Sequence, residues 1–511
     1  MKRNAVLVGI MMVLVVGGAS CLKTPEAVYN EAVSQAQTLV AQGQPERAAD
    51  LLRKLYDNTR FLPYRPNLLG MMINCQLRAW RLDAAQALFR EAAGCDLALA
   101  GSVFGLIENW MLEQGQSYEA AEWCAAIQTY HFSPAIILKL ADLHFKALDG
   151  AGSAGRIPEV MTGYFGRLDE AAALDMAVRQ FGFMLGAGRQ ADAVAIRGAV
   201  GEGLKETATR EGVLANMDID LLLAAHSREA ADGHLRKVLG KIPDDSAVRN
   251  LNLVWGAVMQ AGEHGAADEL ATFVLETVKG REAVRTTAMG LWIDTARIQE
   301  AAGLISERLL AAREMGFAAA FILGQMDRVY ETLLGKGRKE DLAAVYGLFE
   351  SLYVAESDQE MKRRAACTLL DLGFFLEKFE DSLKLVEAGA DGSSLERKAM
   401  MIAKIKGHLA LQKGQTAAAV EQFRVFMGYI AKGPEMEVDP VANTRVSREM
   451  ILGLNARRIG DILAGAGNPG EAATCYKEAR AYYQKSLEAF PDKTSKERAQ
   501  VLKLMSEVPG T

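Results

Sequence analysis

Histidine and cysteine are the residues whose spacing would reveal a metal site or a nucleophile in this chain. The six histidines are dispersed along the sequence, at His131, His144, His226, His234, His264 and His408. None forms HExxH, which places two zinc ligands on one helix face, although His226 and His234 could share roughly one face of a helix. Motifs for a phosphate-binding loop (GxxxxGKS or GxxxxGKT) or a nucleophilic serine (GxSxG) are also absent. The sequence therefore predicts no enzyme, no cofactor and no metal.

Five of the six cysteines lie in the body of the chain: Cys75, Cys95, Cys124, Cys367 and Cys475. An odd number cannot pair completely within one chain. Their neighbours are mostly apolar and typical of helices, as in MMINCQL and AEWCAAI. No CxxC or Cys/His zinc spacing occurs. We therefore expect these cysteines to be small buried hydrophobic residues.

The sixth cysteine, Cys21, follows an apolar segment at the start of the chain. Residues 5–16 read AVLVGIMMVLVV, after Lys2 and Arg3, and small residues follow. Twelve residues rise about 18 Å as a helix, which is shorter than the roughly 30 Å hydrocarbon core of a bilayer. The pattern predicts a signal peptide over residues 1–20. A short uncleaved membrane anchor is the alternative.

The sequence Ala19-Ser20-Cys21 resembles the bacterial lipoprotein signal, in which the cysteine becomes the first mature residue and carries acyl chains. By that resemblance, Cys21 is the lipidation site, and residues 21–24 connect the lipid to the fold. The pattern prefers an aliphatic residue where this chain has Gly18. That departure leaves cleavage without lipidation open, which would give a soluble periplasmic or secreted protein. Leu22, in place of an aspartate, weakly favours the outer membrane.

Composition and charge exclude some classes of partner. The chain has 511 residues, of which half are hydrophobic and 24% are charged, with a net charge of −6. Nucleic-acid binding requires a basic face that this balance does not indicate. The chain would also gain little from an anionic lipid surface. Any membrane attachment would therefore come from the N-terminal lipid.

A short sequence motif recurs along the chain: the end of a helix, a Gly-polar turn, and a second helix that begins with alanine. It reads LVAQGQPERAADLL in its first copy and LAGAGNPGEAATCY in its last. The turn glycines are Gly43, Gly115, Gly188, Gly262, Gly414 and Gly467. Weaker copies between them indicate a repeat of about 36 residues and about eleven units. Strand signals are scarce, so we expect an all-α solenoid of tandem helical hairpins.

The repeat resembles the tetratricopeptide repeat (TPR), most clearly near the C-terminus. The family places small residues where two helices cross and an aromatic residue beside them. Two units fit, with Gly407, Ala419 and Phe423 in one and Gly460, Ala472 and Tyr476 in the other. Ala479, Tyr483 and Pro491 repeat the second-helix pattern one heptad later, which predicts a lengthened helix. The resemblance implies a TPR-like superhelix, with a generic helical-hairpin solenoid as the alternative.

Interruptions of the pattern divide the chain. ALDGAGSAGRIPEV is rich in small residues, and AKGPEMEVDPVANTRVSRE carries two prolines. The predicted segments after the lipid-anchor region are N-terminal TPR-like repeats over 25–146, a loop or hinge over 147–160, degenerate helical repeats over 161–430, an inter-repeat loop over 431–449, and a C-terminal repeat with an extended second helix over 450–506. The longer loop is either an ordinary connection or an insert that contacts a partner.

In TPR proteins, exposed positions of the first helices line a groove that holds an extended peptide or its carboxylate. By resemblance, the groove residues here are Lys404, His408, Arg457, Arg458 and Asp461. Arginine suits bidentate recognition of a carboxylate. The chain departs from the family's pattern because asparagine is absent at the matching positions.

The first hypothesis is therefore an exported, lipid-anchored adaptor that binds proteins or peptides in a cell-envelope assembly, such as protein export, pilus assembly or polysaccharide secretion. The first helix is expected to begin at Pro25, about three residues after the lipid, so the partner would lie near the same membrane. One alternative is an enzyme or carbohydrate-binding protein with its site in the groove. The tryptophans argue against it because they read as parts of apolar helical runs: Trp80, Trp110, Trp123, Trp255 and Trp292. A purely structural, oligomeric spacer is the other alternative.

Overall fold

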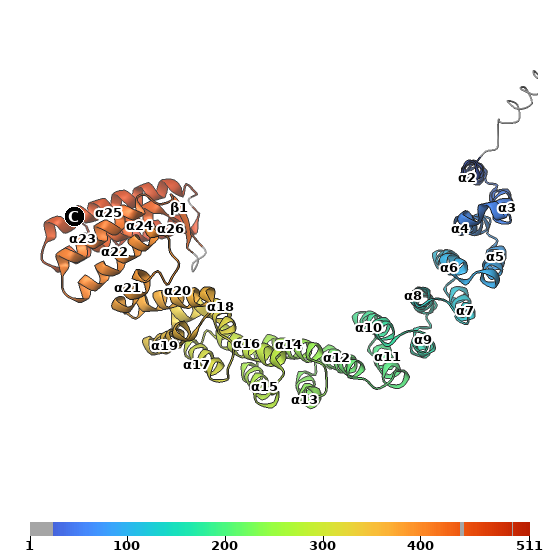
Figure 1. The fold of residues 1–511 in the computed structure, drawn as a ribbon, viewed down its shortest axis with the longest axis horizontal. Coiled ribbons are helices and arrows are strands. Elements are labelled where there is room, and N and C mark those ends of the chain that lie inside the picture. Colours follow the sequence, from blue (N-terminus) through green and yellow to red (C-terminus); the bar gives the residue numbers. More distant parts are fainter. Residues whose placement is uncertain (1–23, 440–443, 493, 511) are drawn as a thin grey trace, which may run out of the picture. The chain divides into compact units, whose positions relative to one another are not determined.

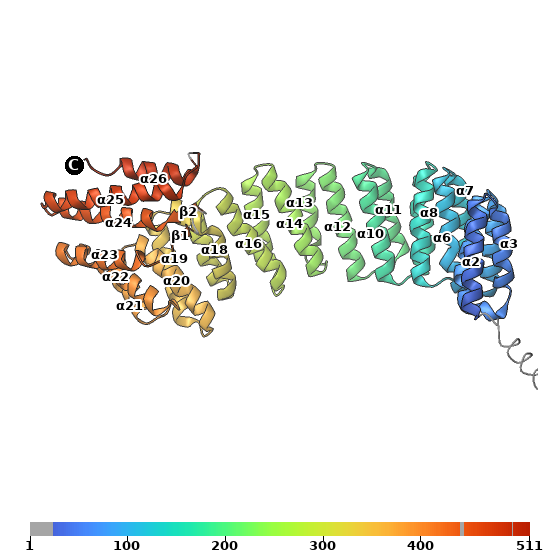
Figure 2. The ribbon, with the colours of Figure 1, turned by 90° about the horizontal axis from the view of Figure 1, so that it is seen from above.

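The computed structural model describes residues 24–439, 444–492 and 494–510. The predicted signal peptide and Cys21 lie outside these residues. The chain divides into two compact units, one ending at Val254 and the other beginning at Trp255. Each unit is a succession of antiparallel helix pairs (Figures 1 and 2). The predicted fold class, an all-α solenoid of helical hairpins, is confirmed within each unit.

The N-terminal unit contains two short 3₁₀ helices, η1 (Thr59–Tyr64) and η2 (Ala154–Arg156), and a series of α-helices. In order, these are α2 (Pro25–Ala41), α3 (Pro45–Tyr56), α4 (Arg65–Arg78), α5 (Leu82–Cys95), α6 (Leu97–Glu113), α7 (Ser117–Ile127), α8 (Pro134–Gly150), α9 (Ile157–Phe165), α10 (Glu170–Gly186), α11 (Gln190–Gly203), α12 (Ala208–Ala224) and α13 (Arg228–Val238). The boundary between the units falls within α14 (Asp244–Gln260).

The C-terminal unit continues the pairs and adds two strands. Its helices are α15 (His264–Thr277), α16 (Glu282–Ile298), α17 (Ala302–Glu314), α18 (Ala319–Lys336), α19 (Lys339–Ala355), α20 (Gln359–Phe375), α21 (Phe379–Glu387), α22 (Leu395–Gln412), α23 (Thr416–Ile430), α24 (Arg448–Gly465), α25 (Pro469–Ala489) and α26 (Lys496–Ser506). Strands β1 (Met436–Asp439) and β2 (Thr444–Ser447) pair antiparallel, with Met436 opposite Ser447.

Helix α2 begins at Pro25, as predicted, and Thr24 caps it. The Thr24 hydroxyl accepts a hydrogen bond from the Ala27 backbone N–H at 3.2 Å, and Pro25 occupies the first turn. Glu26 lies in the same turn, where a negative charge is favoured by the helix dipole. The predicted start at Pro25 is thus the start of the first helix among the described residues.

The turns within the pairs share one backbone geometry. Each predicted turn glycine has a positive φ, from 69° at Gly414 to 80° at Gly467. At the first turn, the Gly43 N–H bonds to the Val40 carbonyl, and the Gln44 N–H bonds to the Leu39 carbonyl. These bonds satisfy the last carbonyls of the helix. Glycine adopts this left-handed conformation without the penalty that a Cβ would bring.

Four turns adopt the same geometry without glycine, at Trp80, His226, Glu300 and Glu377, whose φ values lie between 53° and 58°. These turns correspond to the weaker copies of the sequence motif. The α18–α19 connection differs, because Gly337 is extended with φ −70° and ψ 136°. The prediction for Trp80 was wrong: it does not lie inside an apolar helix but in the α4–α5 turn, and it is 70% exposed.

The small-and-aromatic packing that the TPR resemblance implies is present at the C-terminal pairs. A Cβ added to Gly407 would lie 2.9 Å from the Phe423 ring, and one added to Gly460 would lie 2.6 Å from the Tyr476 ring. Gly453 meets the Tyr483 ring in the same way, at 2.6 Å, one heptad further along α25. The 21 residues of α25 carry both tyrosines. Each glycine therefore makes room for a ring between crossing helices.

Two intervals differ from their predicted loops. Within 147–160, α8 continues to Gly150 because Ala147 and Leu148 are buried against neighbouring helices, and Gly152 then makes a turn with φ 69°. Within 431–449, β1 and β2 form a short ladder. Ser447 ends β2 and caps α24, since its hydroxyl accepts from the Met450 N–H at 3.1 Å. Residues 440–443 lie outside the description.

The cysteines confirm the burial prediction only in part. Cys75, Cys124 and Cys475 are buried, whereas Cys367 is half-buried and Cys95 is exposed. Cys124 in α7 donates a hydrogen bond from Sγ to Glu108 Oε1 in α6. Glu108 is fully buried, and burial raises the pKa of its carboxyl to about 8. This titratable residue sits inside the helix layer of the N-terminal unit.

Over the described residues, no helix combines the length and the apolar character needed to cross a membrane.

Candidate functional site

The first helices of three successive pairs, α20, α22 and α24, surround a hollow in the C-terminal unit. Its volume is about 430 Å³. Three predicted groove residues, Lys404, His408 and Arg458, lie in its wall. The other lining residues are Phe374, Phe375, Phe426, Ile451, Leu454 and Asn455. We call this hollow the Lys404 pocket.

Helix geometry explains why these residues meet. Lys404 and His408 are four positions apart on α22, so they lie on one face of that helix. Arg458 faces them from α24, where its Nη1 donates to His408 Nε2 at 3.3 Å. A neutral imidazole accepts this bond, with its proton on Nδ1. The structure therefore brings these three predicted residues together in one hollow.

Aromatic rings hold His408 in place. Its ring stacks on Phe379 with centroids 4.8 Å apart, and it meets Phe374 and Phe423 edge-on at 5.8 and 5.2 Å. Burial, followed by the charges of Arg458 and Lys404, lowers the pKa of His408 to about 4. The imidazole is therefore neutral near pH 7 and can serve as an acceptor.

The two cations of the pocket face aromatic rings. Lys404 Nζ lies 4.5 Å from the Phe374 centroid, and Arg458 Cζ lies 5.6 Å from the Phe423 centroid. Desolvation by burial lowers the pKa of Lys404, and the charge of Arg458 lowers it further. Neither side chain forms an ion pair with a carboxylate of the described residues. The pocket therefore concentrates positive charge that the fold does not neutralise.

Arg457 and Asp461, predicted to share the groove, lie elsewhere. Arg457 Nη1 pairs with Glu507, just beyond α26, at 2.8 Å, and its Nε lies 3.9 Å from Asp461. Asp461 also accepts a hydrogen bond from the Tyr476 hydroxyl at 2.9 Å. The cause is the helical turn of about 100° between neighbouring residues, which directs Arg457 and Arg458 to different sides of α24.

A second hollow of about 670 Å³ lies along α16, α18 and α20. Its arginines already have partners: Arg328 pairs with Asp294, Arg363 with Glu360, and Arg364 with Asp327. Asp371 also lines this hollow, and its charge acts on Lys404 in the opposite sense to that of Arg458. The Lys404 pocket differs from this neighbour because its own cations are unpaired.

Sequence reasoning missed the aromatic and amide residues of the pocket. Phe374 and Phe375 form an adjacent pair at the end of α20, which could have signalled that one of them is exposed, as Phe375 is at 51%. Asn455 lies one turn before Arg458, and its Nδ2 donates to the Ile451 carbonyl at 2.8 Å. It lines the pocket although it does not occupy the family's asparagine position.

The described ranges contain no cluster of three or more histidine, cysteine, aspartate or glutamate residues placed to hold a metal ion.

Comparisons with known proteins give likenesses at low identity. No protein-family model matches the sequence, and no curated protein matches it. The chain is similar to a solved structure of the APC/C hetero-tetramer Cut9–Hcn1, with a TM-score of 0.24 and 13% identity over 99% of this chain and 93% of the other. It is similar to the Naa15/Naa10 complex bound to HypK-THB, with a TM-score of 0.28 and 12% identity over 94% of this chain and 79% of the other.

The pentatricopeptide repeat protein PPR10 from maize is a further likeness, with a TM-score of 0.32 and 13% identity over 99% of this chain and 78% of the other. At these values, the assignment to helical-hairpin arrays rests on the turns and helix crossings of the chain itself.

Proposed function

We propose that the chain is a scaffold that binds the C-terminal segment of a partner protein through its terminal carboxylate, held in the Lys404 pocket. The observation that carries the proposal is the pair of unneutralised cations, Lys404 and Arg458, set against aromatic rings in one hollow. Lys404 is partly buried without an ion-pair partner in the described part of the chain, and the opposing charge of Asp371 acts on it less than burial and Arg458 do, so a bound carboxylate would stabilise it. Phe375 and Leu454, both exposed at the rim, would contact the apolar side chain next to the carboxylate.

The cellular setting belongs to the same proposal and is supported by the sequence. Residues 1–20 have the sequence pattern of a signal peptide, Cys21 follows them, and α2 begins at Pro25. We propose that Cys21 carries a lipid that holds the array at the periplasmic face of a membrane, with the outer membrane weakly favoured. The short connection then keeps partners close to that membrane, in a cell-envelope assembly such as protein export, pilus assembly or polysaccharide secretion.

The binding claim is tested with two fluorescent pools of random pentapeptides that lack aspartate and glutamate, one with free C-terminal carboxylates and one amidated. We expect anisotropy to show binding of the carboxylate pool alone. Lys404→Gln and Arg458→Gln should each weaken it roughly tenfold or more, because each removes a charge-assisted contact.

The matched control is Lys406→Gln. Lys406 is exposed on the same helix, and its nearest carboxylate, Glu387, lies 3.9 Å away. It should leave binding unchanged. Equal binding of the amidated pool, or equal losses in the Lys404 and Lys406 variants, would contradict the proposal.

A further inference from the structure

The α4–α5 turn of the N-terminal unit places a tryptophan where most of the equivalent turns have glycine. Trp80 has φ 58° and an exposed fraction of 70%. A non-glycine residue in this region costs roughly 1 kcal/mol. The ring recovers little by burial, since its aromatic contact is the edge of Trp110 at a centroid distance of 5.4 Å. Because His226, Glu300 and Glu377 share this backbone geometry, what distinguishes Trp80 is the large apolar side chain that the turn exposes, a feature of binding surfaces.

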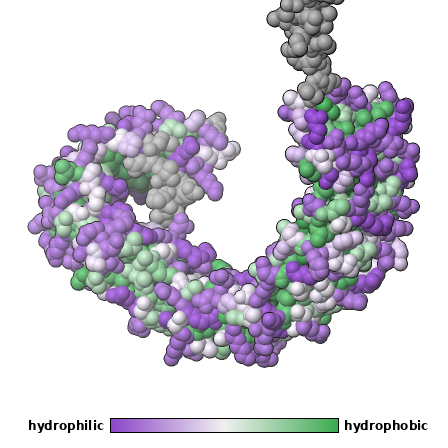
Figure 3. Space-filling view, turned by 45° about the vertical axis from the view of Figure 1, so that its right-hand side comes forward, coloured by the Kyte–Doolittle hydropathy of each residue, from purple (hydrophilic) through white to green (hydrophobic). Residues whose placement is uncertain are grey.

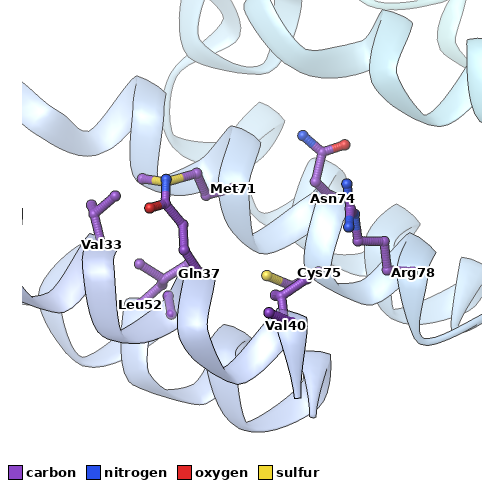
Figure 4. Close-up of a pocket in the computed structure, with 10 residues that line it drawn as sticks. Val33, Gln37, Val40, Leu52, Met71, Asn74, Cys75 and Arg78 are labelled. Atoms are coloured by element: carbon purple, nitrogen blue, oxygen red, sulfur yellow. The ribbon is translucent and has the colours of Figure 1, made fainter. Parts of the chain in front are cut away.

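Two hollows adjoin beside this turn. The first, of about 360 Å³, lies between α2 and α4 above Leu52 of α3. Figure 4 shows Val33 and Val40 of α2 on one side and Met71 of α4 on the other. The second, of about 710 Å³, is lined by Trp80 together with the start of α3. Val40 and Arg78 line both hollows, so the two form one continuous surface.

The first hollow is predominantly apolar. Val33, Val40, Leu52 and Met71 line it, while Gln37 lies between Val33 and Met71, and Asn74 and Arg78 lie towards one end (Figure 4). Figure 3 shows apolar patches on the surface of the first helices, close to where the described chain begins. A hollow of this size takes one or two large apolar side chains, and their burial would provide most of the binding energy.

The junction of the two hollows carries a positive charge that is not used in an internal ion pair of the described residues. Arg78 is exposed and has no carboxylate partner in the described ranges. The nearby carboxylate of Glu46 is already matched, because Arg81 lies 3.5 Å from it. Arg47 donates to Gln44 Oε1 at 2.8 Å and adds a second cation to the polar hollow. An incoming carboxylate would therefore pair with Arg78 without displacing an internal partner.

We infer that this surface, formed by Val40, Met71, Arg78, Trp80 and Trp110, binds an acidic segment of a partner protein in which an apolar side chain adjoins a carboxylate. The apolar side chain enters the hollow between α2 and α4, the carboxylate pairs with Arg78, and a neighbouring apolar group covers Trp80. A glycan is the weaker match, because its hydroxyl groups would find few hydrogen-bond partners along the apolar wall. We call this the Trp80 surface.

This surface is independent of the Lys404 pocket. It belongs to the N-terminal unit, and its residues come from the first two helix pairs and from α6, which carries Trp110. One chain would then hold a terminal carboxylate at one site and an internal acidic segment at the other, which suits a scaffold that joins two partners or binds one partner at two points. A negative result in the test of one site would not argue against the other.

The test uses two variants of the full chain and one control. Trp80→Gly removes the ring and places glycine at a left-handed turn, so the melting temperature should hold or rise. Arg78→Gln removes the cation from an exposed position. Glu300→Gly makes the same backbone change at an equivalent turn of the other unit, where φ is 53°, and controls for effects on stability.

The probe is a fluorescein-labelled peptide with Leu-Asp-Phe at the centre of a Gly/Ser sequence and an amidated C-terminus. Its counterpart carries Leu-Lys-Phe. We expect saturable binding of the Asp peptide alone, weakened roughly tenfold by Arg78→Gln and more strongly by Trp80→Gly. Glu300→Gly and Lys404→Gln should leave it unchanged, which separates this site from the Lys404 pocket.

Three results would overturn the inference. The first is equal binding of the Lys counterpart. The second is unchanged binding by a folded Trp80→Gly protein. The third is absence of peptide binding while a soluble chitooligosaccharide binds wild type and not Trp80→Gly, which would make this a glycan surface.

Discussion

Glu108 offers a quantitative test of the packing in the N-terminal unit. Its carboxyl is fully buried between helices, with Oε1 accepting from Cys124 Sγ and Oε2 without a hydrogen-bond partner among the described residues. Burial raises its pKa from 4.5 to about 8. Glutamine has the same shape and no proton to lose. The change Glu108→Gln therefore removes the titration while keeping the volume and the oxygen that accepts from Cys124.

The direction of the pH effect on stability follows from the linkage between protonation and folding. Because the folded-state pKa lies above the unfolded value, the contribution of Glu108 to stability is complete below pH 4.5 and is lost as the pH rises towards 8. With these two pKa values, wild type should lose about 3 kcal/mol of stability relative to Glu108→Gln between pH 5.5 and pH 8.

Stability in a repeat array is a sum of local terms, so the assay must be local. Hydrogen exchange of the α6 and α7 amides, corrected for intrinsic rates at each pH, gives the free energy of opening there. Glu113→Gln, at an exposed position of the same helix, is the control and should follow wild type. A difference between wild type and Glu108→Gln that does not change with pH would refute the reasoning.

Three further predictions concern other parts of the molecule. Gly460→Ala should destabilise the C-terminal unit by roughly 1–3 kcal/mol in urea unfolding, although alanine has a better helix propensity than glycine. The reason is that the new Cβ would lie 2.6 Å from the Tyr476 ring. A stabilised variant would contradict this packing. Burial lowers the pKa of His144 to about 4, so the contribution of this residue to stability is present above pH 6.5 and is lost as the pH falls through 4. Over that interval, the free energy of unfolding of His144→Gln should fall by roughly 3 kcal/mol less than that of wild type. Equal acid sensitivity of the two proteins would argue against this. Intact mass should show that the mature protein begins at Cys21 and carries added acyl groups. The Cys21→Ser variant should lack the acyl mass and should no longer appear in the membrane fraction. An unmodified Cys21 would exclude the lipid anchor without affecting the repeat architecture.

The features predicted well from sequence are those set by backbone and steric rules that act locally. The turn glycines were identifiable because a left-handed turn strongly favours glycine. The pairing of Gly407 with Phe423 and of Gly460 with Tyr476 was identifiable because helix crossing needs a small residue beside a large one. These rules act within a single helix pair, so the spacing of residues in the sequence contains them.

Other features depend on contacts between distant segments. Trp80 occupies a glycine position and therefore reads as part of an apolar run, whereas the turn exposes it. Arg457 was assigned to the groove with Arg458, but Glu507, beyond the last helix pair, engages it instead. The strand ladder around residues 440–443 also escaped prediction, because four-residue strands leave too short an alternation to recognise.

The central claim is that the Lys404 pocket binds a carboxylate, and the protonation of His408 reports on it most directly. The measurement is an NMR titration of His408 with N-acetyl-Leu-Phe present in excess, compared with its C-terminal amide. The pKa of the free protein should lie near 4. A bound carboxylate should raise it by stabilising the imidazolium and by offsetting the charges of Lys404 and Arg458, while the amide should leave it unchanged. An unchanged pKa with the saturating carboxylate, or an equal shift with the amide, would contradict the account.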